Sequence, residues 1–80
     1  MTRAEIEEQL VRIVRQEKDV PDELLKPETA LADAGIDSLD ALTILFAIEE
    51  QFRISIPDTE ARAAKTFGDL IAIIEARATA

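Results

Sequence analysis

One serine in this chain stands where its hydroxyl could be presented to another molecule. Ser38 lies within the stretch Gly35-Ile36-Asp37-Ser38-Leu39-Asp40, directly before a long apolar run. Gly35 can supply the backbone angles of a turn, Asp37 can cap the first free amides of a helix, and Asp40 can complete a capping box. We therefore expect Ser38 to point outward from a first helical turn, where free amides and the helix dipole favour an anion such as a phosphate diester.

Apolar residues recur at helical spacing in three long segments, which predicts an all-α fold. The first segment follows a capping-box pair, Thr2 and Glu5, and runs to about Lys18. The second is the apolar run behind the serine. The last follows another capping-box pair, Thr66 and Asp69. Together with one short helix, these segments predict a small four-helix bundle, made of three main helices and one short one.

The connections between these helices differ in length. Residues 19–36 lack a sustained period and contain two prolines, so we expect a long loop between the first two helices, held to the core by its apolar side chains. After the second helix, Pro57 ends the preceding segment. Asp58 is then expected to cap a short helix from Thr59 to about Ala64.

The composition excludes several kinds of chemistry. The chain has 80 residues with no cysteine and no histidine, which removes disulfides, thiolate nucleophiles, the usual general base and the usual nitrogen metal ligand. Its apolar runs are too short for a membrane span, and nothing resembles a signal peptide. We expect a single domain over residues 1–80, monomeric, soluble and cytoplasmic, with little room for an enclosed catalytic cleft.

The net charge of −8 is concentrated around the serine. From Asp19 to Glu50 there are nine acidic residues and a single basic one, Lys26, so this segment carries the whole excess. Such a surface is unsuited to nucleic acid and suited to basic patches on partner proteins.

The second helix carries two apolar stripes when its residues are projected at about 100° per residue. The stripe expected to face the core consists of Ala41, Ile44, Leu45, Ile48 and Phe52. The other stripe consists of Leu39, Leu42 and Phe46, beside the acids Asp40, Glu49 and Glu50. Either the helix is buried on two faces, or the second stripe is a docking strip beside the serine, and we favour the docking strip.

Catalysis by Ser38 itself is not expected. No histidine or lysine near it in the sequence could take its proton, and the adjacent carboxylates disfavour its alkoxide. The nearby acids Asp33, Asp37 and Asp40 lack the spacing of an EF-hand loop, so no dedicated metal site is predicted. An acidic helical adaptor without a prosthetic group remains an alternative that explains the charge but gives Ser38 no role.

The stretch Gly35-Ile36-Asp37-Ser38-Leu39-Asp40-Ala41-Leu42, with Ile48-Glu49-Glu50-Gln51-Phe52 and Ile56-Pro57-Asp58 after it, resembles the signature of acyl carrier proteins. The similarity spans nearly the whole chain. It implies that Ser38 carries a 4′-phosphopantetheine arm through a phosphodiester. It also implies that the thiol of this arm holds acyl groups as thioesters, in fatty acid or related acyl-chain biosynthesis.

The resemblance also implies partners and roles. A phosphopantetheinyl transferase would load Ser38 and read Asp37, Leu39 and Asp40 around it. Acyl-transferring, synthase or ligase enzymes with basic patches would dock on a partner-facing set: Asp40, Leu42, Phe46, Glu49 and Glu50. A sequestered acyl chain would lie among aliphatic side chains that leave no polar group unpaired: Ile44, Leu45, Ile48, Ile56 and Ile74.

Some residues depart from the common fatty-acid carrier pattern. Thr43 stands where those carriers usually have a glutamate, and Phe46 replaces a smaller or more flexible residue. Ile36-Asp37 differs from the glycine-histidine pair usual in peptidyl carriers, so the acyl subclass fits better. These departures predict a specialised carrier that serves a dedicated synthase, ligase or transferase.

Overall fold

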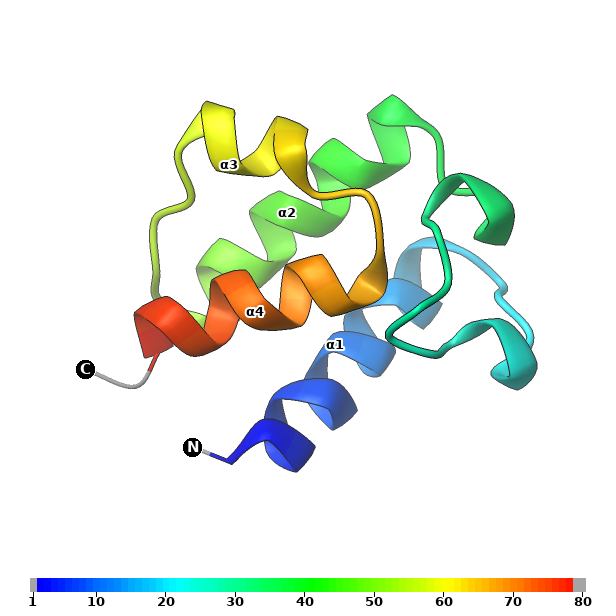
Figure 1. Cartoon of the computed structure of the whole chain (residues 1–80), viewed down its shortest axis with the longest axis horizontal. Coiled ribbons are helices and arrows are strands. Elements are labelled where there is room, and N and C mark those ends of the chain that lie inside the picture. The colour runs from blue at the N-terminus through cyan, green and yellow to red at the C-terminus, as the bar shows by residue number, and fades with distance from the viewer. Residues whose placement is uncertain (1, 79–80) are drawn as a thin grey trace.

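The computed structural model describes residues 2–78, which form four α-helices (Figure 1). These are α1 (Arg3–Glu17), α2 (Ser38–Phe52), α3 (Asp58–Ala63) and α4 (Phe67–Ala78). No strand occurs within residues 2–78, where an isolated antiparallel bridge pairs Ala30 with Thr66. The predicted all-α bundle of three main helices and one short helix is confirmed.

The helices alternate in direction along the chain, and α1 packs against both α2 and α4 (Figure 1). The short helix α3 lies beyond α2, on the side away from α1. The bidentate pair between the Arg77 guanidinium and the Glu60 carboxylate holds it there, together with a 2.8 Å bond from Arg77 Nε to the Ser55 carbonyl. One arginine of α4 therefore fixes both α3 and the segment before it.

The long loop between α1 and α2 contains two short 3-10 turns, η1 (Asp22–Leu24) and η2 (Ala32–Ala34). The Arg15 guanidinium on α1 pairs with Asp22 at the start of η1. Hydrogen bonds from the Leu31 amide to the Lys65 carbonyl (2.9 Å) and from the Gly68 amide to the Pro27 carbonyl (2.8 Å) tie the loop to the start of α4. The loop is thus an ordered wall of the domain.

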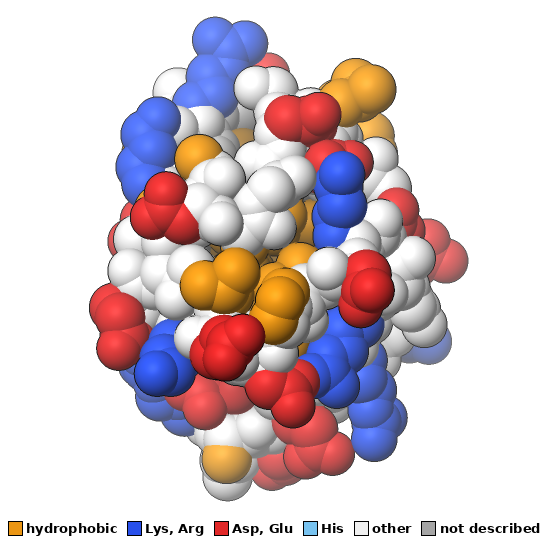
Figure 2. Space-filling view, turned by 90° about the vertical axis from the view of Figure 1, so that its right-hand side faces the viewer, with side chains coloured by type: hydrophobic (Ala, Val, Ile, Leu, Met, Phe, Trp, Pro, Cys, Tyr) orange, Lys and Arg blue, Asp and Glu red, His pale blue; other side chains and the backbone are white. Residues whose placement is uncertain are grey.

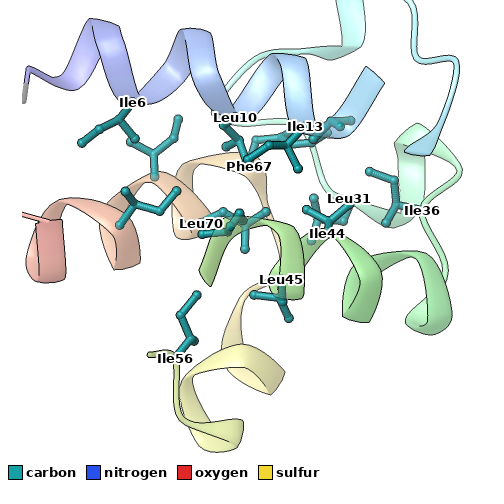
Figure 3. Close-up of a cluster of buried hydrophobic side chains, with 14 of the residues drawn as sticks. Ile6, Leu10, Ile13, Leu31, Ile36, Ile44, Leu45, Ile56, Phe67 and Leu70 are labelled. Carbon is teal, nitrogen blue, oxygen red and sulfur yellow. The ribbon is translucent and has the colours of Figure 1, made fainter. Parts of the chain in front are cut away.

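The core is aliphatic apart from one phenylalanine and receives side chains from the three long helices, the loop and the segment before α3 (Figure 3). Its buried members are Ile6, Leu10, Ile13, Val14, Val20, Leu31, Ile36, Ile44, Leu45, Ile48, Ile56, Phe67, Leu70, Ile71 and Ile74. The predicted core face of α2 is buried or partly buried in this cluster. So are the large aliphatic side chains expected to hold the loop to the core: Val20, Leu24, Leu25, Leu31 and Ile36. Burial of this apolar area is the main term that stabilises so small a domain.

The predicted capping boxes of α1 and α4 are confirmed. Thr2 Oγ1 accepts the Glu5 amide at 3.2 Å, and Thr66 Oγ1 accepts the Asp69 amide at 3.1 Å. The prediction for α3 was wrong by one residue: Pro57 occupies the cap position without a side-chain hydrogen bond, and Asp58 is the first helical residue. The fixed φ of proline suits this extended cap position, so α3 begins at Asp58 rather than at Thr59.

Candidate functional site

Ser38 is the first residue of α2, and its side chain is exposed to solvent. The chain reaches it through Gly35, whose φ of +80° places it in the left-handed region and ends η2. A 3.0 Å bond from the Ile36 amide to the Leu31 carbonyl then directs the buried Ile36 side chain inward. The predicted exposure of the serine hydroxyl is confirmed.

The capping box around Ser38 has the predicted partners. Asp37 Oδ1 accepts the Asp40 amide at 2.8 Å, and Asp40 Oδ2 accepts the Asp37 amide at 3.4 Å. Asp37 has the extended backbone of a cap residue, and its carbonyl accepts the Ala41 amide at 2.8 Å. The two carboxylates of the box accept the Asp37 and Asp40 amides. The first amides of α2, those of Ser38 and Leu39, have no acceptor within the helix. This helix end can therefore accept an anionic group on the serine.

The Asp40 carboxylate also makes a contact that the sequence did not predict. Lys18 Nζ, at the end of α1, lies 3.1 Å from Asp40 Oδ2. This ammonium group, followed by the amide of Asp37, lowers the pKa of the Asp40 carboxyl group below its usual value. The pair joins the end of α1 to the start of α2 and favours the charged form of Asp40 beside Ser38.

The second apolar stripe of α2 is not covered by the described part of the chain. Leu39 is 75% exposed, Leu42 46% and Phe46 61%, and these are the large hydrophobic side chains that residues 2–78 leave exposed. The alternative in which α2 is buried on two faces is therefore wrong for this chain. The resulting apolar strip (Leu39, Leu42 and Phe46) begins at the residue after Ser38.

The acids predicted beside this strip differ in their surroundings. Glu50 is exposed, whereas Glu49 is partly buried, and its Oε2 accepts the Ile56 amide at 2.9 Å. Glu49 thus holds the segment before α3 against α2, a structural role that sequence reasoning missed. The face that carries the loop and the start of α2 displays many acidic side chains among several basic ones, with some hydrophobic side chains exposed at its centre (Figure 2).

A groove of about 580 Å³ lies beside Ser38, between α2, the end of the loop and α3. It shares an apolar lining with a smaller inner cavity of about 20 Å³: Leu31, Ile36, Ala41, Leu45, Ala61 and Ala64. Its charged lining residues are Asp37, Asp58, Arg62 and Lys65. Neither Arg62 nor Lys65 forms an ion pair within the described part of the chain.

Five residues were predicted to surround a sequestered acyl chain, and all of them are buried: Ile44, Leu45, Ile48, Ile56 and Ile74. Only Ile44 and Leu45 among them line the inner cavity behind the groove. The other three belong to the packed core outside the lining of this cavity. The residues of the loop and of α3 that complete the lining were missed, because their approach to α2 depends on tertiary packing.

Within residues 2–78, no three acidic side chains are placed so that they could hold a metal ion together. The acids Asp33, Asp37 and Asp40, close in sequence, are therefore not assembled as a ligand set in the described part of the chain. No described helix is both long enough and apolar enough to cross a membrane.

Comparisons with known proteins agree with this site. Residues 8–74 match the family model described as "Phosphopantetheine attachment site". The acyl carrier protein of Thermosynechococcus vestitus is 37% identical over 81 residues, covering the whole of both chains. Acyl carrier proteins of Sulfurovum sp. (43% identity, 79% of this chain and 84% of the relative) and of Helicobacter hepaticus (40% identity, 86% and 92%) are also similar. The chain therefore belongs to the acyl carrier protein family, whose role is to hold acyl groups on a 4′-phosphopantetheine arm.

Proposed function

We propose that the Ser38 hydroxyl is the attachment point of the 4′-phosphopantetheine arm. The observation that carries this proposal is the exposed serine on the first turn of a helix capped by Asp37 and Asp40. The free amides of this turn suit a phosphodiester, and the adjacent groove has room for the atoms that follow the phosphate. The residues present therefore fit the group that the family carries.

The chain itself presents the hydroxyl and does not activate it. The sequence has no histidine, and the ammonium group of Lys18 pairs with Asp40 rather than with Ser38. We infer that the transferase supplies the base that takes the serine proton. When bound, the arm supplies a thiol to which an acyl group is joined as a thioester. What this protein contributes is a fixed, water-exposed anchor and a surface that partner enzymes can read.

We propose that this surface is the apolar strip with the acids around it. Asp37 and Leu39 flank the serine and would be read by the transferase. Partner enzymes with basic patches would dock on the wider set of residues: Asp40, Leu42, Phe46, Glu49 and Glu50. The exposure of the strip supports this assignment, since an apolar patch rimmed by charges is typical of protein interfaces. Glu49 would contribute its charge while its carboxylate holds the Ile56 amide.

The groove is the proposed entrance for an acyl chain. Its lining continues into the inner cavity beside Ile44 and Leu45. That cavity, about 20 Å³, is close to the smallest space that holds a single water molecule. Entry of an acyl chain therefore requires α3 to move away from α2. The aliphatic lining would lose few polar contacts in this movement.

We infer that this carrier serves a dedicated biosynthetic pathway. We also propose that it is a monomeric, single-domain protein of the cytoplasm. Thr43 places no charge on α2 where the common fatty-acid carriers have one, and its hydroxyl bonds to the Leu39 carbonyl at 3.1 Å. Phe46 gives the strip a larger apolar contact. The dedicated pathway is tested by measuring acyl transfer to this carrier by housekeeping fatty-acid enzymes and by the enzymes of a dedicated pathway. Efficient use of the carrier by the housekeeping enzymes would contradict the inference.

The attachment site is tested by intact mass after incubation with a phosphopantetheinyl transferase and coenzyme A. The chain has two serines, which provides a matched control. The wild type and Ser55→Ala are expected to gain one phosphopantetheine, and Ser38→Ala none. A mass gain on Ser38→Ala would contradict the proposal.

A further inference from the structure

The groove beside Ser38 has basic side chains on the wall opposite α2. Arg62 lies on α3, and Lys65 follows two residues after its end. Both are exposed, both line the groove that Ser38 also lines, and neither has an ion-pair partner within the described residues. The protein has a net charge of −8 and many carboxylates. The groove beside Ser38 nevertheless holds two basic side chains without carboxylate partners, which suggests that they bind another anion.

We infer that Arg62 and Lys65 hold the phosphodiester of the arm and so keep the first part of the arm in the groove. This inference rests on the proposed attachment at Ser38. A phosphodiester carries a negative charge at neutral pH and is joined directly to the serine oxygen. Arginine and lysine both bind such groups, and both have side chains long enough to reach across a groove.

The charges around the serine favour this arrangement. A phosphodiester on Ser38 adds a negative charge beside the carboxylates of Asp37 and Asp40. The ammonium group of Lys18 already pairs with Asp40, so part of its positive charge is neutralised and its attraction for the phosphate is weaker. The cations of the groove are therefore those best placed to offset the added charge. Asp58 also lines the groove and weakens the attraction, which should leave the arm only partly docked.

Another large groove in the described part of the chain has three basic residues in its lining, and two of them are paired with acids. It is lined by residues of α1, the loop and α4, and its volume is about 520 Å³. There Arg12 pairs with Glu8 on α1, and Arg15 pairs with Asp22 of the loop. Lys26 lines this second groove, which Ser38 does not line, and like Lys65 it is exposed and has no ion-pair partner among residues 2–78. It provides a matched control for removing a positive charge.

Docking of the arm is measured on apo and holo protein by amide chemical shifts, after intact mass has verified loading. The reporters are the amides of Ala61 and Ala64, which line the groove. We expect these amides to shift between apo and holo wild type at low salt. The shift should shrink by about two- to fivefold in Arg62→Gln or Lys65→Gln, as for a solvent-exposed ion pair, and stay unchanged in Lys26→Gln.

Salt provides a second test that needs no substitution. The Debye length falls from about 10 Å at 0.1 M to about 3 Å at 1 M, so the shift in wild-type holo protein should decrease as salt is added. Holo protein that shows no shift at these amides, or a shift that neither salt nor the two substitutions change, overturns the inference and leaves the attachment at Ser38 intact. Failure of the wild type to load refutes the proposed function, and the inference with it.

Discussion

Asp37 caps α2, and in the proposed function it is also a charge that the transferase reads. Replacing it by alanine removes a 2.8 Å hydrogen bond to the Asp40 amide and the negative charge at the helix start. Loss of such a cap costs about 1 kcal/mol, and loss of the favourable charge–dipole interaction adds about 0.3–1 kcal/mol. The free energy of unfolding of Asp37→Ala should therefore be about 1–2 kcal/mol lower than that of the wild type.

Asp37→Asn separates the two roles. Asparagine caps a helix about as well as aspartate, so this variant should lose only the charge–dipole part of the stability. Its loading by the transferase should nevertheless fall about tenfold in kcat/KM, corresponding to about 1.4 kcal/mol, because the charge beside Ser38 is gone. Urea unfolding gives the first quantity, and initial rates of phosphopantetheine transfer give the second.

A matched control comes from the cap of α1. Thr2 Oγ1 caps α1 through the Glu5 amide at 3.2 Å, in the same kind of box and away from Ser38 in the sequence. Thr2→Ala should lose about 1 kcal/mol of stability and keep its loading rate. The reasoning is refuted when Asp37→Ala is as stable as the wild type, or when Asp37→Asn loads as fast as the wild type.

Further predictions concern the strip, the turn and the charge pair. Phe46→Ala should change the free energy of unfolding by no more than about 0.5 kcal/mol but weaken the binding of partner enzymes, measured as a raised KM. Ile48 is fully buried, so Ile48→Ala should lower the free energy of unfolding in urea by about 2–5 kcal/mol. Gly35→Ala should cost about 1–2 kcal/mol by the same measurement, because alanine is strained at a φ of +80°. Since Lys18 lowers the pKa of Asp40, the wild type should be more stable than Lys18→Gln above about pH 4, and this advantage should vanish as the pH falls through the lowered pKa. An advantage that persists in strong acid would contradict the last prediction.

The parts of the site that were predictable from the sequence are those set by near neighbours along the chain. The caps at Thr2, Asp37 and Thr66 join residues three apart, and one helical projection separates the strip of α2 from its core face. Both follow from backbone geometry that is nearly independent of the rest of the fold.

The missed contacts join residues that only the folded chain brings together. Lys18 reaches Asp40 because α1 packs beside α2, and Glu49 reaches the Ile56 amide because the chain turns back after α2. The groove likewise needs α3 to lie against α2, which the Arg77–Glu60 pair helps to fix. No spacing in the sequence predicts such partners, since each depends on how two separate elements pack.

The most direct test of the account is to locate the acyl-bearing arm on the protein. The transferase is given an acyl form of coenzyme A, and the modified protein is analysed by tandem mass spectrometry before and after neutral hydroxylamine. We predict an acyl-phosphopantetheine on Ser38, with the acyl group released by hydroxylamine and the phosphopantetheine retained. A modification on any other residue, or an acyl group that hydroxylamine leaves in place, would contradict the account.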